Sequence, residues 1–392
     1  MRRQNDYEPL FRKRGQGAFH APRQGFAIVR IRSIYWPDVT ENGVRQMFLT
    51  NSWYVAGWDD EVTRTPRQIE VLGEKIVVFR KQDGQPAALE DACPHRKLPL
   101  SMGRVIGDDL ECGYHGMTFD CSGGCVRVPG QGRIPPSASV RSFPVKSRWG
   151  LVWIWMGDPA LADPADIFVV EHYDDPEWGI NRGEPIDIDC NYLLVTDNLL
   201  DPSHVAWVHQ SSFGSAACEE EPLNVDVADD GVTVWRWMLD VEPAPFYAKL
   251  LTFEGKCDRK QHYEVRYPSL ALIKAIFSPA GTGGEDKALH EQSFIMDSYN
   301  FMTPVNDKQT RYYWFQLRNV RPGCEETSKY MSASVKSAFE EDRVILNAVQ
   351  KGLDTAARPP IDIAIDAGGN RFRKRLERLI EQEQSAISTA AE

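Results

Sequence analysis

The hydrophobic pattern divides the chain into two regions that contain different elements. Between about 48 and 157, short runs of β-branched and aromatic residues are separated by turns rich in glycine, proline and aspartate. Runs of this kind are typical of strands, and the clearest ones lie at 53–55, 70–79 and 150–156. The pattern therefore predicts a small all-β domain with two prominent loops.

Beyond residue 178 the strand candidates are spaced as in an antiparallel sheet, and helical patterns join them. A helix-like stretch covers 192–209, and two further helical segments close the chain. The strand candidates are 186–190, 232–239, 263–267, 271–277, 292–300 and 312–320, and the closing helices are expected near 328–353 and 370–384. This half of the chain reads as an antiparallel sheet flanked by helices.

These patterns predict an α+β protein with an all-β domain at 47–157 and a sheet-and-helix domain at 179–392. The stretch 158–178 is rich in aspartate and proline and reads as a linker. Residues 1–46 hold nine Arg or Lys against four Asp or Glu, unlike the rest of the chain. We interpret them as an extension ahead of a start at Met47, and a basic arm is the alternative.

Composition and charge narrow the possible partners. The net charge of −11 argues against nucleic acid, because binding to phosphates needs a basic surface. No segment approaches the roughly 20 apolar residues that span a bilayer, and the N-terminus lacks the apolar stretch of a secretory signal. We expect a cytoplasmic protein that binds neither nucleic acid nor membrane.

Four of the eight cysteines are clustered, and two of them form pairs with histidine. Cys93 and His95 make a C-x-H motif, and after sixteen intervening residues Cys112 and His115 follow as C-x-x-H. Two thiolates on one iron and two imidazoles on the other are the ligands of a Rieske [2Fe–2S] cluster. A zinc site of the Cys₂His₂ type is the alternative, although zinc fingers usually have two cysteines followed by two histidines.

The other cysteines are not assigned as ligands. Cys121 and Cys125 lie near the cluster motif, but no histidine accompanies them. Scattered thiols in an enzyme of this size are expected in the core, and those here are Cys190, Cys218, Cys257 and Cys324.

A second motif follows at 197–209, where His204 and His209 are five residues apart. On a regular helix the two side chains lie roughly 140° apart, so they can share one metal only if the helix is distorted or ends there. Asp201, three residues before His204, shares its face. Alone these are ordinary histidines, but beside a redox cluster they predict an iron site that a carboxylate would complete. The acidic residues at 339–343 are candidates, and their spacing alone does not choose among them.

Both motifs together resemble the oxygenase component of Rieske non-haem iron oxygenases, in the branch of vanillate and dicamba O-demethylases. The segments that carry the resemblance are 47–56, 90–96, 112–116, 197–201 and 365–369, and it spans nearly all of 47–385. One departure is Lys97-Leu98, where relatives commonly have Gly-Ala.

The resemblance implies specific roles for residues of the second motif. It assigns His204, His209 and Asp342 as iron ligands and places Asn198 beside the iron. Asp201 would link the two metal centres by accepting hydrogen bonds from His115 and His204, across a subunit boundary in a head-to-tail homotrimer.

The resemblance also implies the reaction. A reductase with flavin and its own [2Fe–2S] centre would pass electrons from NAD(P)H to the cluster and then to the ferrous iron, where O₂ oxidises a small aromatic compound. We expect O-demethylation of a methoxylated aromatic acid such as vanillate. N-demethylation, methyl hydroxylation and ring dihydroxylation stay open, as does a Rieske electron carrier without oxygenase activity. Cationic candidates for holding an aromatic acid are Lys274, His290, Arg311 and Arg318.

Overall fold

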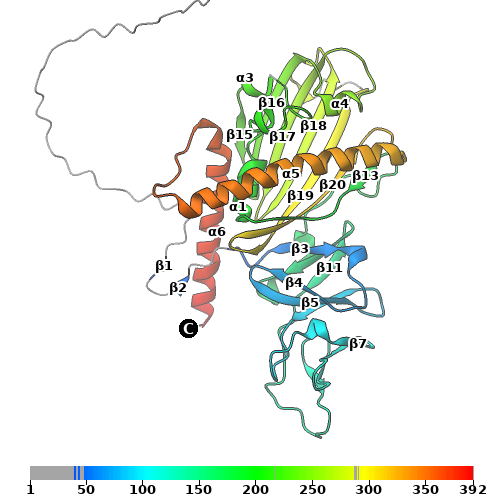
Figure 1. The fold of residues 1–392 in the computed structure, drawn as a ribbon, viewed down its shortest axis with the longest axis vertical. Coiled ribbons are helices and arrows are strands. Elements are labelled where there is room, and N and C mark those ends of the chain that lie inside the picture. The colour runs from blue at the N-terminus through cyan, green and yellow to red at the C-terminus, as the bar shows by residue number, and fades with distance from the viewer. Residues whose placement is uncertain are drawn as a thin grey trace, which may run out of the picture.

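The computed structural model describes residues 48–391 except 216, 287, 288 and 290, together with two short strands before them (Figure 1). These strands, β1 (Val39–Thr40) and β2 (Gly43–Val44), pair with each other. The rest of the predicted extension at 1–46 lies outside the described residues. Within the described part of the chain, no helix combines the length and apolar content that crossing a membrane requires.

The N-terminal β-domain consists of three small antiparallel sheets, ordered β11-β12-β3, β4-β5-β6 and β10-β9-β8-β7. Its strands are β3 (Trp53–Trp58), β4 (Arg67–Val71), β5 (Glu74–Arg80), β6 (Pro86–Glu90), β7 (Arg104–Ile106), β8 (Asp109–Glu111), β9 (Thr118–Phe119), β10 (Cys125–Arg127), β11 (Val145–Arg148) and β12 (Leu151–Trp155). Short 3₁₀ turns accompany them at Asp59–Glu61 and Leu100–Met102. The cysteine motifs occupy the loops after β6 and after β8.

The single strand expected at 70–79 is wrong, because the segment is a hairpin. β4 ends at Val71 and β5 begins at Glu74, and Leu72 and Gly73 turn the chain with φ of 54° and 80°. Both strands send apolar side chains into the same core, although Gly73, Glu74 and Lys75 interrupt the apolar residues between them.

The C-terminal domain is built on one large antiparallel sheet ordered β13-β20-β19-β18-β17-β16-β15, with β14 also pairing to β20. Its strands are β13 (Gly179–Arg182), β14 (Ile186–Ile188), β15 (Asn224–Val227), β16 (Gly231–Val241), β17 (Cys257–Arg266), β18 (Leu270–Pro279), β19 (Phe294–Asn306) and β20 (Gln309–Arg318). Its helices are α1 (Tyr192–Leu199), α2 (Val205–Val208), α3 (Ala217–Glu220), α4 (Pro245–Ala248), α5 (Glu325–Thr355) and α6 (Ala367–Ala391), with a 3₁₀ turn at Ala364–Asp366 before α6. The predicted α+β class is confirmed.

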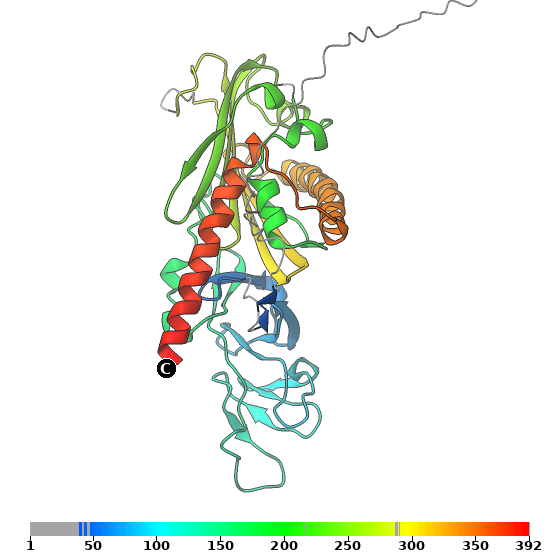
Figure 2. The ribbon, with the colours of Figure 1, turned by 90° about the vertical axis from the view of Figure 1, so that its left-hand side faces the viewer.

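The two faces of this sheet are covered differently. Helices α1 and α5 lie over one face, and the main core is buried between them and the sheet (Figures 1 and 2). The opposite face packs against strand β3 of the β-domain and against the stretch predicted as a linker. That stretch contains 3₁₀ turns at Pro159–Leu161 and Pro164–Asp166, and it buries Ile167 and Val170. This stretch therefore connects the two domains and also packs between them.

Candidate functional site

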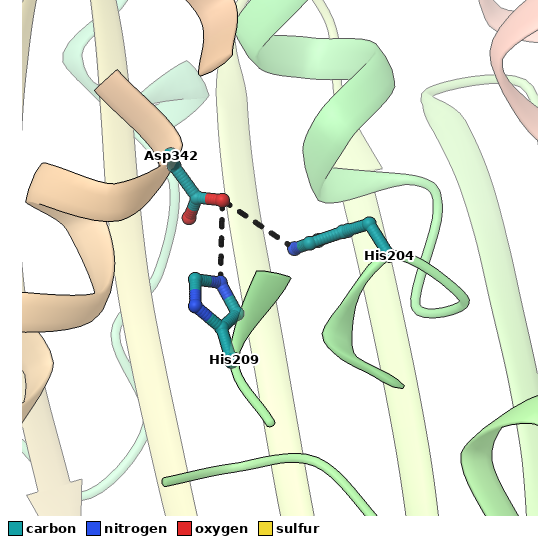
Figure 3. A group of neighbouring side chains, drawn as sticks. All are labelled: His204, His209 and Asp342. Carbon is teal, nitrogen blue, oxygen red and sulfur yellow. Dashed lines mark ion pairs between the residues drawn. The ribbon is translucent and has the colours of Figure 1, made fainter. Parts of the chain in front are cut away.

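Three side chains converge between the large sheet and the helices that cover it: His204, His209 and Asp342 (Figure 3). Their nearest ligand atoms all lie within 4.8 Å of one another. Asp342 Oδ1 is 3.6 Å from His204 Nε2 and 3.2 Å from His209 Nε2. The structure thus brings together the two histidines and one of the carboxylates considered in the sequence.

The local fold explains how histidines five residues apart can meet. The helix expected across 192–209 is interrupted, because α1 ends at Leu199 and α2 is a single turn. His204 precedes α2 and His209 follows it with φ −110° and ψ 35°, so the helix ends at the second histidine. This break was the condition under which the two imidazoles could approach one metal.

Helix α5 supplies the carboxylate from its buried stripe. The residues on that stripe recur at steps of three and four, and they include Val335, Ala338, Asp342 and Leu346. Asp342 is the one carboxylate among the buried residues of this helix, and only 7% of it is exposed. It therefore points at the sheet, whereas its acidic neighbours Glu340 and Glu341 are each partly exposed.

Hydrogen bonds set which nitrogen of each imidazole faces the site. His204 Nδ1 lies 2.5 Å from the main-chain oxygen of Asp201, and His209 Nδ1 lies 2.7 Å from Glu341 Oε2. Carbonyl and carboxylate oxygens only accept, so both Nδ1 atoms must carry a proton and both Nε2 lone pairs remain available. Acceptors behind metal-bound histidines orient the rings in this way.

The donor set fits a ferrous ion. Ligand atoms that are each about 2.1 Å from one metal at right angles would be about 3 Å apart, and the separations of 3.2 and 3.6 Å from Asp342 Oδ1 are close to this value. Two histidines and one carboxylate on one side of a metal leave positions open for oxygen. Burial acts to lower the pKa of His209, but Asp342 and Glu341 outweigh it and raise that pKa, so protons compete with a metal for this nitrogen.

A pocket opens from the triad toward the sheet. The space inside it that a water-sized molecule can enter is about 70 Å³, and the pocket is partly open to solvent. Its walls are mainly apolar and include Val205, Phe213, Ile273, Met296, Val335 and Phe339. The polar groups on its lining, apart from the triad, are Asn198, Tyr247, Tyr263, Ser298 and Gln316.

The cationic anchors proposed from the sequence do not line this pocket. Lys274 pairs with Asp297 and Glu171, and its neighbour Ile273 is the residue of β18 that faces the pocket. Arg311 lies 3.5 Å from Asp187, in a different cleft between the two domains. Arg318 is fully buried and donates to main-chain oxygens and to Ser328. His290 lies outside the described residues.

Asn198 and Asp201 both contact residues of the triad. Asn198 Nδ2 donates to Asp342 Oδ1 at 3.3 Å, which helps to orient the carboxylate. The carboxylate of Asp201 accepts from Ser203 N at 2.8 Å, and it is the main-chain oxygen that contacts His204. Within one chain the cluster loops near β7 lie at the far end of the β-domain, whereas the helix α1 lies over the large sheet of the C-terminal domain (Figure 1).

The cysteine–histidine loops of the β-domain have the same backbone pattern. Cys93 and Cys112 are each 2% exposed, whereas the rings of His95 and His115 are exposed, with centroids 4.7 Å apart. In each loop the cysteine N–H donates to the carbonyl five residues later, and its carbonyl accepts from the N–H four residues later. Burial raises the pKa of the Cys93 thiol. Two buried sulfurs and two outward imidazoles fit the ligand set of a Rieske cluster.

Lys97 stands at the point where this repeated loop favours glycine. Its φ is +59°, and Gly116, at the matching position of the second loop, has φ +69°. A non-glycine residue is strained there. The loop keeps its hydrogen bonds despite this residue, and the departure from the family pattern therefore does not change the ligand geometry.

The remaining cysteines differ in their surroundings. Cys121 and Cys125 donate to the main-chain oxygens of Asp108 and Arg127. Cys190, Cys218 and Cys257 are fully buried, as expected of core thiols. Cys324 is only partly buried and precedes α5, so the core assignment was wrong for that residue.

Glu341, Ser298 and Gln316 were missed as site residues. Glu341 was noted only as one of several acidic candidates, and its contact with His209 has no signal in the sequence. Ser298 and Gln316 are ordinary polar residues within strands, and only the fold shows that they face the pocket.

Comparisons with known proteins agree with both halves of the chain. Residues 52–144 match the Rieske [2Fe-2S] domain, and residues 188–382 match the vanillate O-demethylase oxygenase C-terminal domain. A putative toluene-4-sulfonate monooxygenase system iron-sulfur subunit from Comamonas testosteroni is 40% identical over 87% of this chain and 100% of its own length. The vanillate O-demethylase oxygenase subunit of Pseudomonas sp. (strain HR199 / DSM 7063) is 37% identical over 88% of this chain and 98% of its own length.

A solved structure has the same overall fold. The crystal structure of dicamba monooxygenase bound to 3,6 dichlorosalicylic acid superposes with a TM-score of 0.80 at 31% identity, covering 86% of this chain and 99% of that one. The resemblance inferred from the two motifs is confirmed. The chain belongs to the Rieske non-haem iron oxygenases, as an oxygenase component related to those of vanillate O-demethylase and dicamba monooxygenase.

Proposed function

We propose that this oxygenase component oxidises a methyl carbon carried by a small aromatic acid, and that its main reaction is O-demethylation of a methoxylated acid such as vanillate. The observation that carries the proposal is the apolar pocket that ends at His204, His209 and Asp342. Such a pocket suits a flat aromatic ring, and the triad leaves room for oxygen beside it.

The residues that hold the metals are part of the proposal. Cys93, Cys112, His95 and His115 would hold the [2Fe–2S] cluster, and His204, His209 and Asp342 the iron. When bound, the iron supplies the site at which O₂ is reduced. For a methyl ether the overall change is R–OCH₃ + O₂ + 2e⁻ + 2H⁺ → R–OH + HCHO + H₂O.

The chain's own side chains position the substrate and exclude water. Phe213, Met296 and Phe339 wall the pocket, so a ring bound there loses contact with solvent. Asn198 restrains the Asp342 carboxylate through its 3.3 Å hydrogen bond. The protein thereby positions the substrate and excludes water from the pocket, and the cofactors carry out the redox chemistry.

Electron delivery is proposed to cross between subunits of a homotrimer. The cluster loops lie at the far end of the β-domain, with the sheets of β3 and β5 between them and α1, so a second copy would have to bring a cluster to Asp201 (Figure 1). A head-to-tail contact of this kind closes into a ring. The Asp201 carboxylate is only partly buried, and within the described chain Oδ2 has no hydrogen bond. We place the protein in the cytoplasm, where a flavin and [2Fe–2S] reductase has access to NAD(P)H.

Oxidation of a ring methyl group is the second candidate. It is favoured by the 40% identity to the putative toluene-4-sulfonate monooxygenase subunit, which exceeds the 37% to the vanillate enzyme. Both reactions begin with attack on a CH₃ carbon.

The test is turnover of a substrate panel by the purified protein with a surrogate reductase. Methoxybenzoates, toluene-4-sulfonate and N-methyl compounds would be scored for formaldehyde and for hydroxylated product. We expect a brown protein with three irons per chain and formaldehyde release from a methoxybenzoate. A colourless protein, or two irons per chain, would contradict the cofactor assignment. Hydroxymethyl product without formaldehyde would favour the second candidate.

A further inference from the structure

Two polar side chains lie next to each other on the sheet side of the otherwise apolar pocket. Ser298 on β19 and Gln316 on β20 are register partners, and both line the pocket. They are 3% and 1% exposed. Buried polar groups are retained only where hydrogen bonds satisfy them, so the partners of these two side chains show what each can still bind.

The amide of Gln316 has a defined orientation. Its Oε1 accepts from Asn181 Nδ2 at 2.9 Å, across the β13–β20 pair. The orientation of Asn181 follows from its other neighbour, because its Oδ1 lies 3.5 Å from Arg318 Nη1, and an arginine can only donate. Its Nδ2 also donates to Ser332 Oγ, whose own hydrogen goes to the main-chain oxygen of Arg182.

The Nε2 group of Gln316 is therefore the end of the amide that makes no hydrogen bond to a described residue. No described residue accepts a hydrogen bond from it, and Gln316 is a lining residue of the pocket. It can therefore donate two hydrogens to a ligand.

Ser298 adds a third possible donor at the same place. Its Oγ is 3.4 Å from Asn300 Oδ1, which already accepts a shorter bond of 2.8 Å from the Tyr312 hydroxyl. The hydrogen of Ser298 is therefore only weakly held and can rotate to a ligand. Beside it, Gln316 offers its amide hydrogens, so the two residues form a small group of neutral donors.

We propose that Gln316, assisted by Ser298, is the specificity-determining group that binds the acid oxygens of the aromatic substrate, in place of the cationic residues expected from the sequence. This inference rests on the proposed function. Hydrogen bonds from neutral donors to an anionic oxygen are strong in a dry pocket. Carboxylate and sulfonate share this chemistry, and both offer several acceptor oxygens. No described lining residue is Lys or Arg.

The test compares acidic and neutral ligands in matched variants. The probes are 4-methoxybenzoate, toluene-4-sulfonate and neutral 4-methylanisole, with KM and kcat from turnover and Kd from calorimetry. Gln316→Glu keeps the shape but replaces the donor with a carboxylate. We expect KM and Kd for the acids to rise roughly 10- to 100-fold, with kcat within a few-fold and 4-methylanisole unaffected. Gln350→Glu, at a 9% exposed position on α5 outside the pocket, is the control.

A second variant tests the orientation without touching the pocket. Asn181→Asp removes the donor that holds Gln316 Oε1, so the Gln316 amide should turn and present its oxygen to the ligand. Affinity for the acids should fall again, although residue 181 does not line the pocket. This variant also guards against misfolding of the Gln316 variant, and the circular dichroism of both variants would be compared with wild type to check the folding of the C-terminal domain.

The outcomes separate the two proposals. A loss of affinity for both acids supports recognition of an oxyanion in general. A loss of affinity for one acid alone also supports the role of Gln316, and it assigns the substrate class. Equal loss for acids and the neutral ether, or unchanged preference in Gln316→Glu, overturns the role of Gln316 and leaves the proposed function standing. A wild-type protein that binds and oxidises none of the probes overturns both.

Discussion

Removing the carboxylate of Glu341 should weaken iron binding without changing any iron ligand. Its Oε2 lies 2.7 Å from His209 Nδ1, while the ring's other nitrogen faces Asp342. Glu341→Ala takes away the acceptor that holds the proton on Nδ1 and sets the angle of the ring. A carboxylate behind a ligand histidine also makes that ligand more basic, so both orientation and donor strength decline.

The size of the effect follows from burial. Loss of such a partner typically weakens metal affinity 10- to 100-fold, or about 1.4 to 2.7 kcal/mol. The side chain of His209 is 5% exposed, but that of Glu341 is 39% exposed, so solvent screens part of the interaction. We therefore expect a loss near the lower end, roughly 10-fold.

The neighbouring Glu340 provides a matched control. Its side chain is 40% exposed, and it pairs with Arg343 at 2.6 Å instead of with a histidine. Glu340→Ala removes the same charge from the same helical turn. Ferrous affinity would be measured by competition with a chelator, and cluster absorption would show that the β-domain is intact. If both variants lose affinity equally, charge alone explains the effect and the argument from His209 fails, as it does if Glu341→Ala binds iron like wild type.

Three further predictions concern other parts of the chain. Asp201→Asn should keep a normal cluster spectrum and lose product formation, and wild-type turnover would remove Asp201 from the electron path. Lys97→Gly should raise the free energy of unfolding by about 0.5 to 1 kcal/mol, seen as a higher Tm, because φ +59° strains a lysine; a lower Tm would contradict this. Burial acts to raise the pKa of Asp258, but hydrogen bonds from Asp240 N and from Gly281 and Thr282 outweigh it and hold that pKa below its usual value. Because the pKa is lower in the folded state, the ionised carboxylate stabilises the fold at pH values above the unfolded pKa of about 3.9, and this stabilisation is lost as the pH falls. The difference in stability between wild type and Asp258→Asn should therefore be constant from about pH 5 to 8 and shrink below about pH 4.

The sequence was most informative where chemistry is local. Cys93, His95, Cys112 and His115 identify a cluster because the ligand types and their spacing lie within two short loops. Several strand positions in the C-terminal domain were also predictable, although the prediction at 263–267 covered only the end of β17, and β13 and β15 were missed. The hairpin at Leu72-Gly73 was missed because the apolar residues on its two sides were taken as one strand, although Gly73 and the charged pair after it mark the turn.

The pocket was less predictable, because its chemistry depends on which face of the sheet a residue occupies. Lys274 and Arg311 were reasonable anchors by charge, yet the sheet places both outside the pocket. Gln316 carries no charge, and its importance arises from Asn181 and Arg318, which are distant from each other in sequence and determine which end of its amide is free. A network of this kind has no local signature.

The three consecutive acids of α5 show how a helix assigns different roles to similar residues. Successive side chains project about 100° apart, so Glu340, Glu341 and Asp342 cannot share an environment. Asp342 continues the buried stripe that includes Val335 and Ala338, so its side chain faces the sheet. The spacing of this stripe is visible in the sequence and could have distinguished Asp342 from its acidic neighbours without the family resemblance. Glu341 lies at the edge of that face, where it reaches His209 but not a metal position, and Glu340 pairs with Arg343. A shift of one residue in the register of this helix would exchange the ligand for its orienting group, which is why packing along the whole stripe, rather than the acids themselves, determines the ligand.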